Sequence, residues 1–532
     1  MYIDNKIYMG LADTAEKQRV WMHLNQCNRH GLIAGASGTG KTITMKCMAE
    51  SFSAAGVPVF MCDVKGDVSG MAEPGADNSG MQKRIDKFGI RDTFQFRGYP
   101  VTFWDIYGQG GHPIRTTVSD MGPDILARIL GLTEIQEGVL NVIFRIADEH
   151  GLKLLDMKDL RAMIKHVSDN RAQYSLEYGN MAAQSIGAIN RALIPLEDEG
   201  AEQFFGEPML NIMDWIRTDS DGRGMINILH AVETIKYPQL YAAFLLWMMA
   251  ELFENLPELG DADKPKMVFF FDEAHLLFDD APKALVQKIE QVVKLIRSKG
   301  VGIYFVTQSP SDIPDAVLAQ LSNRVQHALR AYTPAEQKAV RTAAKTFRPN
   351  PDFDTEDVIM MLGTGEALTS FLDEEGIPQI VQKTAIICPE SLMAPCAEET
   401  KRVLMRDSEI GRKYDTPVDN ESAYEILEEE AAAKAEADKL AAERAALEKE
   451  KAEWEAAKAK EEEERKKAAE KEAARLEKER EKEEAEKKKQ EEKEAKEKKK
   501  RTDRILSKIE TQIISAGGQL LKRGLLGILK LK

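Results

Sequence analysis

A glycine-rich segment near the start of the chain has the residue types that bind a nucleoside triphosphate. Residues 35–42 read GASGTGKT and match GxxxxGK[ST] at every fixed position. In this pattern, glycines let backbone N–H groups wrap phosphates, and the helix that follows favours negative charge at its N-terminus. We expect Lys41 to reach the β- and γ-phosphates and Thr42 to place its hydroxyl on Mg²⁺. The candidate nucleotide-binding residues are Gly35, Ala36, Ser37, Gly38, Thr39, Gly40, Lys41 and Thr42.

Two carboxylates further along the chain have the chemistry that complements this loop. Asp272 and Glu273 directly follow the apolar run Met267–Phe271, which is typical of a central strand. In an open α/β sheet, side chains at the carboxyl end of such a strand lie beside the phosphate-binding loop. We therefore predict that Asp272 holds Mg²⁺ through water and that Glu273 orients and polarises the attacking water. The predicted cofactors are ATP and Mg²⁺.

Three other polar residues stand at the ends of predicted strands. Gln308 follows the apolar segment 301–306 and could contact the γ-phosphate or the attacking water; the alternative is a strand-to-loop cap. Asp63 and Lys65 end the strand after the first helix, where they either border the site or form a polar turn.

The order of apolar segments indicates how these residues are positioned. Strands are expected at 31–34, 57–62, 101–104, 225–229, 267–271, 302–306 and 324–328, with helices at 42–55 and 238–256. Strand–helix alternation with continuous apolar strands predicts a parallel sheet covered on both faces, an α/β fold of the RecA-like P-loop type. Residues 1–30 are interpreted as a short lead-in, and 67–92 as a loop rich in Gly, Asp and Ser.

The domain organisation follows from shifts in pattern along the chain. Helical spacing between 119 and 224 indicates a helical insertion, which divides the ATPase core into a first part at 1–118 and a second at 225–420. Residues 421–503 are almost entirely Glu, Lys, Ala and Arg, without Pro or Gly. Leu440, Leu447 and Trp454 fall seven apart, but the complementary heptad position is charged or small. A solvated single helix, a weak coiled coil and a disordered segment therefore all remain open.

The last segment, residues 504–532, has an apolar stripe at helical spacing with several lysines and arginines. A basic amphipathic helix of this kind could dock on protein or lie on an anionic membrane surface. Gly517-Gly518 would kink or break it.

Composition narrows the class of protein. The chain has 532 residues, too many for one compact core, with a net charge of −15 that argues against a generally basic, nucleic-acid-coating surface. No apolar run reaches the roughly 20 residues that span a bilayer, and the first residues lack a signal-peptide pattern. The five cysteines are scattered without CxxC spacing, which is typical of reduced thiols. We expect a cytoplasmic protein, with peripheral contact to the inner face of the membrane left open by the tail.

The motifs and their order resemble the HerA/FtsK superfamily of ring-forming P-loop ATPases. The features in common are the P-loop, the turn DVKGD at 63–67, the DE pair at 272–273 that leads into a helix, and TQSP at 307–310. Flanking text such as RHGLIAGASGTGKT and FFFDEAHLLFDDAPKALVQKIEQVVKLIRSKGVGIYFVTQSPSDIPDAVLAQLSNRVQHALRAYT is similar to the bacterial HerA-helicase-like family of the YjgR type, over about residues 1–400. The letters DEAH at 272–275 also occur in DEAH-box helicases, but the C-terminal half lacks their QxxGRxGR-type segment.

The resemblance implies a homo-oligomeric ring, a hexamer, with ATP sites between subunits. Such sites need an arginine from the neighbouring subunit to neutralise charge in the transition state. The candidates are Arg324 and Arg330, around the strand after Gln308, and Arg297 at the end of the preceding helix. Three functions stay open: a DNA translocase or helicase-like motor, a protein-remodelling or assembly ATPase whose charged helix positions a partner, and a nucleotide-dependent scaffold.

Overall fold

The computed structural model describes residues 1–260, 262–278 and 283–486. Residues 1–431 form one compact unit, and residues from 432 onward belong to a second. The predicted amphipathic segment at 504–532 and the end of the charged segment lie outside the described residues.

A sheet of thirteen strands runs through the first unit. The strands are β1 (Tyr2–Ile3), β2 (Lys6–Ala12), β3 (Arg19–His23), β4 (Gly31–Ala34), β5 (Val59–Asp63), β6 (Val101–Asp105), β7 (His112–Pro113), β8 (Ile226–His230), β9 (Met267–Phe271), β10 (Val301–Thr307), β11 (Asn323–His327), β12 (Glu366–Ser370) and β13 (Gln382–Ile386). Their order is β1-β2-β13-β12-β11-β4-β10-β9-β5-β8-β6-β7, with β3 paired to β2. All seven predicted strands are present, with ends shifted by at most two residues.

The strands from β11 to β7 in this order are parallel, as the alternation of strands and helices predicts. The P-loop strand β4 lies between β10 and β11, with Ala34 opposite both Thr307 and Gln326. Phe271 at the end of β9 pairs with Phe305 of β10 and with Cys62 of β5. The carboxyl ends of β4, β10, β9 and β5 therefore meet at one edge of the sheet.

Side chains alternate between two hydrophobic cores, one on each face of the parallel strands. Val268, Phe270 and Val306 pack with apolar residues of α1 (Lys41–Ala54) on one face. Phe269, Phe271 and Phe305 pack on the other face with α9 (Pro238–Asn255) and α10 (Lys283–Leu295). Burial on both faces explains why these strands are continuous apolar runs in the sequence.

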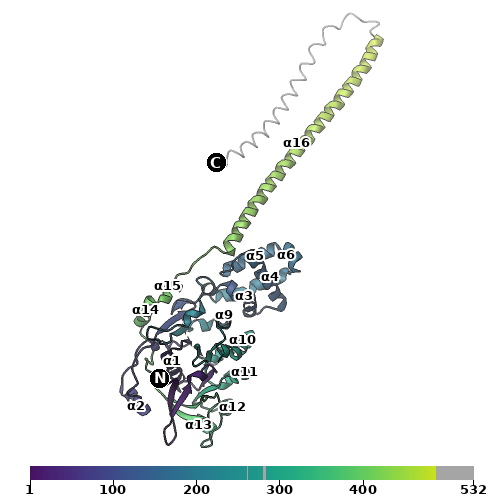
Figure 1. Cartoon of the computed structure of the whole chain (residues 1–532). Coiled ribbons are helices and arrows are strands. Elements are labelled where there is room, and N and C mark those ends of the chain that lie inside the picture. The colour runs from purple at the N-terminus through teal and green to yellow at the C-terminus, as the bar shows by residue number, and fades with distance from the viewer. Residues whose placement is uncertain (261, 279–282, 487–532) are drawn as a thin grey trace. The chain divides into compact units, whose positions relative to one another are not determined.

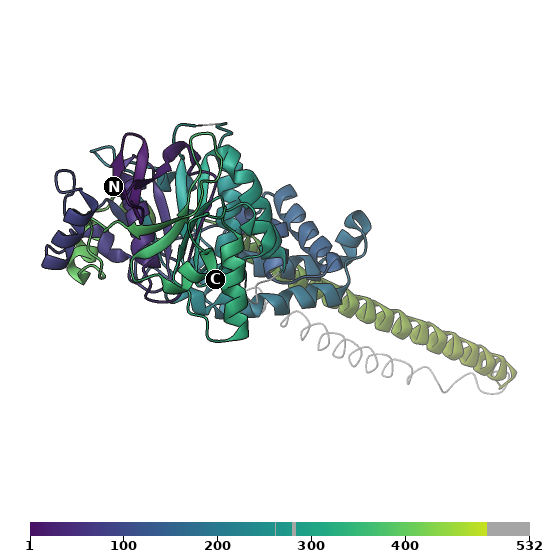
Figure 2. The same ribbon diagram turned by 90° about the horizontal axis from the view of Figure 1, so that it is seen from below.

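Helices α3 to α8 occupy the predicted insertion between β7 and β8 and gather on one side of the first unit (Figures 1 and 2). They are α3 (Val118–Ile129), α4 (Glu134–Glu149), α5 (Met157–Asp169), α6 (Arg171–Tyr178), α7 (Ala183–Asp198) and α8 (Ala201–Phe204). Their buried residues belong to the same core cluster as Phe269 and Phe305. The insertion therefore shares its core with one face of the sheet.

Two segments differ from their sequence interpretation. The expected lead-in 1–30 forms β1, β2 and β3, which join β12 and β13 in an antiparallel extension of the sheet. The expected loop 67–92 contains α2 (Ser79–Phe88). The Asn78 side chain accepts a hydrogen bond from the backbone N–H of Met81 at 3.0 Å and caps the helix. Met81 and Phe88 are buried. The cap and the apolar face stabilise the helix although the segment is polar in composition.

Helix α11 (Asp315–Leu318) connects β10 to β11. The helices after β11 are α12 (Pro334–Lys345), α13 (Thr355–Met361), α14 (Glu398–Asp407), α15 (Glu409–Tyr414) and α16 (Ala423–Glu486). Ala423 and Leu427 of α16 are buried in the first unit, whereas Leu440, Leu447 and Trp454 are exposed. The predicted charged helix is thus one continuous helix over its described part. No described helix combines the length and the apolar character needed to cross a bilayer.

Candidate nucleotide-binding site

The loop between β4 and α1 has the backbone that a phosphate cradle needs. Gly35 and Gly38 have φ of 152° and 74°, in the region that side chains rarely adopt. A Cβ on Gly35 would lie 2.5 Å from Cβ of His327, whereas a Cβ on Gly38 would meet nothing within 4 Å. The loop is therefore packed closely against β11 at its start and open at Gly38, where phosphate oxygens would approach the backbone.

Three backbone hydrogen bonds fix the loop to its surroundings. The N–H of Gly35 donates to Thr307 O at 3.2 Å, and the N–H of Ala36 donates to Ala328 O at 2.9 Å. On the other side, the N–H of Gly365 donates to Thr39 O at 3.0 Å. The ends of both neighbouring strands and the turn before β12 thus hold the loop in place.

Lys41 begins α1 and lies inside the loop. Its Nζ donates to Gly35 O at 2.5 Å and to Ala36 O at 3.2 Å. Burial lowers the pKa of Lys41, and nearby Glu273 and Asp272 partly offset this effect. Within the part of the chain that the structure describes, the ammonium is bonded to loop carbonyls and to no carboxylate, so it can exchange these bonds for phosphate oxygens. Thr42, the next residue of the first turn, is half-buried.

Asp272 and Glu273 lie at the same edge of the sheet, directly after β9. Asp272 is 4 % exposed, and burial raises its pKa from 3.8 to about 6, an effect that Lys65 partly offsets. Burial also acts to raise the pKa of Glu273, but the ion pair with Lys65 outweighs it and the pKa is lowered. Glu273 is therefore held as an anion beside a buried carboxylate that a metal ion would stabilise.

The Lys65–Glu273 ion pair joins the two neighbouring strand ends of β5 and β9. Lys65 Nζ contacts Oε1 of Glu273, while Oε2 lies 3.2 Å from Nδ1 of His275. Glu273 has φ 47° and ψ 46°, a left-handed conformation that is uncommon for a residue with a side chain. The backbone turns sharply here into the short helix Ala274–Leu277, and this turn aims the carboxylate back toward Lys65.

Asp63 and Gln308 complete the carboxyl edge. Asp63 accepts from the backbone N–H groups of Gly66 and Asp67 at 2.6 and 3.2 Å, so it shapes the turn that presents Lys65. Gln308 is exposed and follows Thr307, whose carbonyl accepts from Gly35 of the loop. Gln308 thus lies at the end of β10, between the P-loop strand β4 and the strand β9 that precedes Asp272. From this position its side chain can reach a bound nucleotide.

His327 is a residue of the site that the sequence did not single out. Its ring nitrogens contact Thr44 Oγ1 of α1 at 2.8 Å and Glu366 O at 3.0 Å, and burial lowers its pKa to about 4. The neutral ring links the P-loop helix to β11 and β12. The sequence places His327 at the end of a predicted strand, one residue before Ala328. It does not show which residues the imidazole ring contacts.

The three arginine candidates lie in different places. Arg324 pairs with Leu32 near the start of β4, and its guanidinium donates to the carbonyls of Leu318, Leu321 and Thr346 at 2.7–3.0 Å. Arg330 lies just beyond Ala328 on the P-loop side and donates to Met360 O and Leu362 O. Arg297 is half-buried in the turn before β10. This geometry favours a role within its own chain for Arg324.

These residues fit a nucleoside triphosphate with its metal ion. The open backbone at Gly38, the carbonyl-bonded Lys41 and the buried Asp272 supply N–H donors, a cation and a hard oxygen ligand at one edge of the sheet. Hydroxyl and carboxylate oxygens, as on Thr42 and Asp272, are the ligands that Mg²⁺ prefers.

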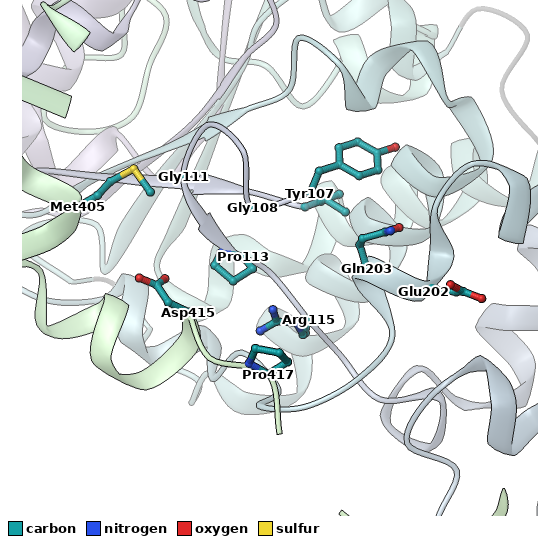
Figure 3. A pocket seen from close by; sticks show the side chains of 11 residues that line it. Tyr107, Gly108, Gly111, Pro113, Arg115, Glu202, Gln203, Met405, Asp415 and Pro417 are labelled. Atoms are coloured by element: carbon teal, nitrogen blue, oxygen red, sulfur yellow. The ribbon is translucent and has the colours of Figure 1, made fainter. Parts of the chain in front are cut away.

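A cavity of about 560 Å³ lies elsewhere in the first unit. It is lined by residues that follow β6 and by Arg115, Gln203 and Asp415, at the end of the strand order far from β4. Figure 3 shows Tyr107 and Gln203 across from Asp415 and Pro417. None of the P-loop or carboxylate residues lines it, so its size is no reason to place the nucleotide there.

Solved structures that align with this chain have low sequence identity to it. The bacterial conjugative coupling protein TrwB, without its first 70 residues, aligns with 15 % identity over 73 % of this chain and 91 % of its own, with a TM-score of 0.47. A TrwB structure with a non-hydrolysable ATP analogue aligns with 13 % identity over 70 % and 90 %, at 0.47. VirB4 of Thermoanaerobacter pseudethanolicus aligns with 13 % identity over 75 % and 99 %, at 0.43.

No curated protein sequence matches this chain. The family model of the helicase HerA-like C-terminal family, in contrast, matches residues 9–532. That range includes the P-loop, the Asp272–Glu273 pair and Gln308, and it agrees with the resemblance that these motifs indicate. The chain therefore belongs to the helicase HerA-like C-terminal family.

Proposed function

We propose that this chain binds ATP with Mg²⁺ and hydrolyses it. The observation that carries the proposal is the pair of carboxylates after β9. Asp272 is buried, and nearby Lys65 only partly offsets the effect of burial on its pKa. Glu273 is kept anionic by its ion pair with Lys65. The metal ion, when bound, would neutralise phosphate charge. The chain itself would bind the phosphates through the loop and Lys41, hold the ion with Thr42 and Asp272, and accept a water proton on Glu273.

Phosphate release by the full chain tests this proposal. Glu273→Gln should keep nucleotide binding and slow turnover by about two to four orders of magnitude, because the amide cannot accept the proton. Lys41→Ala should weaken both binding and turnover. Glu374→Gln, which changes an exposed carboxylate paired with Lys6, is the matched control and should turn over at the wild-type rate. Wild-type turnover by Glu273→Gln would remove this assignment of the water-orienting carboxylate.

We also propose that the chain works as a homo-oligomeric ring, a hexamer, with Arg330 acting on the site of the neighbouring subunit. Arg330 is exposed and follows the strand that contacts the P-loop, which supports this choice over Arg324. Inactive Lys41→Ala chains mixed with Arg330→Ala chains should recover part of the activity, since some interfaces then pair an intact loop with an intact arginine. A monomer in light scattering that turns over ATP at full rate would contradict the ring.

For the substrate, membership of a helicase-like family supports a DNA translocase or helicase-like motor. The net charge of −15 and the highly charged α16, which is exposed over residues 428–475, support the alternative of a protein-remodelling or assembly ATPase. The ATPase rate with and without duplex DNA, across a salt series, separates them. Stimulation that declines as salt rises indicates contact with the phosphate backbone, and no stimulation at low salt favours the protein partner.

A further inference from the structure

A second, smaller cavity of about 190 Å³ adjoins the P-loop helix. Gly40 and Ile43 of the first turn of α1 form one wall. The other walls come from Met81 and Arg84 of α2, from the turn at Gly365 and from the segment after β13, which includes Cys388. Gly365 also donates its N–H to Thr39 O, so this cavity and the phosphate loop share a boundary.

We propose that this cavity binds the nucleoside part of the nucleotide, with Arg84 against the base. The inference rests on the proposed ATP site. A triphosphate bound along residues 35–42, with its terminal phosphates at Lys41, must direct its nucleoside past the first turn of α1. On the β10 side of the loop lie Thr307 and the carboxylates. The cavity with Gly40 and Ile43 in its wall lies on the opposite side, toward α2 and β13.

The lining suits a flat, aromatic ring. The side chains of Ile43, Met81 and Met393 are apolar, and thioethers pack favourably against aromatic rings. Arg84 donates to Ile386 O at 2.6 Å, and its guanidinium carbon lies 5.4 Å from the ring centroid of Phe88. This carbonyl and this ring hold the guanidinium beside Gly365, where its planar surface can stack on a base.

The same lining determines how the base is selected. Arg84, Thr364 and Cys388 provide the polar side-chain groups, and no Asp, Glu, Asn or Gln is among the described residues that line the cavity. A side-chain carboxylate or amide is the usual partner for the N1 and N2 donors of guanine. Selection therefore rests on shape and stacking, and the cavity accepts adenine and guanine with similar affinity.

Calorimetric titration of the full-length Glu273→Gln chain with ATP and with inorganic tripolyphosphate tests the cavity. Tripolyphosphate contains the phosphates without a nucleoside. Arg84→Ala should weaken ATP binding about tenfold and leave tripolyphosphate binding unchanged. Arg84→Lys keeps the charge but loses the planar group, so it should also weaken ATP selectively. Lys83→Ala, an exposed neighbour on α2, is the control and should change neither affinity.

The outcomes separate this inference from the proposed function. Equal weakening of ATP and tripolyphosphate by Arg84→Ala would make Arg84 a phosphate contact and overturn the nucleoside site, as would unchanged affinity for both. If the Glu273→Gln chain binds neither compound, the nucleotide site itself fails. GTP and ATP affinities within about threefold of each other support selection by shape and stacking, because one lost specific hydrogen bond costs more than this. A difference beyond about thirtyfold overturns it. Thermal unfolding confirms that each variant is folded.

Discussion

Replacing Asp272 by asparagine should stabilise the metal-free protein against unfolding. The same change should reduce the increase in melting temperature that Mg²⁺ and ATP produce. The side chain is 4 % exposed, and burial raises its pKa from 3.8 to about 6. Because the pKa in the folded state lies above the unfolded value, stability is greatest below pH 3.8 and falls as the pH rises through 6. Asparagine has no charge to bury.

The expected size follows from this shift in pKa. Keeping Asp272 ionised at pH 7.5 costs about 3 kcal/mol of unfolding free energy, and at pH 5 about half of that. For a folded unit of 431 residues, 1 kcal/mol corresponds to a change in melting temperature of about 1 °C. We therefore expect Asp272→Asn to melt about 3 °C higher than the wild type at pH 7.5 and about 1.5 °C higher at pH 5.

Thermal unfolding in EDTA, at both pH values, measures the effect. Adding Mg²⁺ and ATP should then raise the melting temperature of the wild type more than that of Asp272→Asn, because only the wild type keeps the ligand for the ion. Asp13→Asn is the control: this exposed carboxylate has its pKa lowered by a hydrogen bond from Lys383, so its loss should bring no gain. No gain for Asp272→Asn at pH 7.5, or a gain that is the same at both pH values, would refute the reasoning.

Three further changes test other parts of the site. Lys65→Met should raise the pKa of Glu273, measured as a shift of the acid limb of the kcat–pH profile to higher pH; an unmoved limb would show that the ion pair does not persist with nucleotide bound. Gly35→Ala forces a Cβ to within 2.5 Å of His327 Cβ, so nucleotide affinity in equilibrium binding should fall by more than tenfold, since the loop must shift. Arg330→Ala should lower kcat by at least about a hundredfold with little change in nucleotide affinity; wild-type kcat would confine Arg330 to its carbonyl contacts with Met360 and Leu362.

The parts of the fold that the sequence predicts are those encoded locally. The P-loop motif fixes the turn between β4 and α1, and the continuous apolar runs identify the central strands because burial on both faces demands them. The antiparallel extension was not predicted. Its strands pair across long separations, as Thr384 does with Ala12, and no local pattern in residues 1–30 encodes that partner.

The site shows the same division. Lys41, Asp272 and Glu273 are found from motifs at one edge of a predictable sheet. Whether Arg324 can act on the site of a neighbouring subunit depends on which end of β11 it occupies. Its pairing with Leu32 places it at the amino end of the strand, away from the carboxyl edge where the site lies. His327 and Arg84 contact Glu366 of β12 and Ile386 of β13, strands that only the folded chain brings near the P-loop helix.

Asp159 of α5 has a buried carboxylate that joins the helices between β7 and β8 to the start of α16. One oxygen accepts from the backbone N–H groups of Leu155 and Asp156, and the other from Ser422 Oγ and the N–H of Tyr424, at the start of α16. These last two partners are synthesised 263 and 265 residues after Asp159. Until residues 422–424 have been synthesised, water must therefore satisfy that oxygen of the carboxylate, and the hydrogen bonds to Ser422 and Tyr424 replace it only when the start of α16 reaches α5.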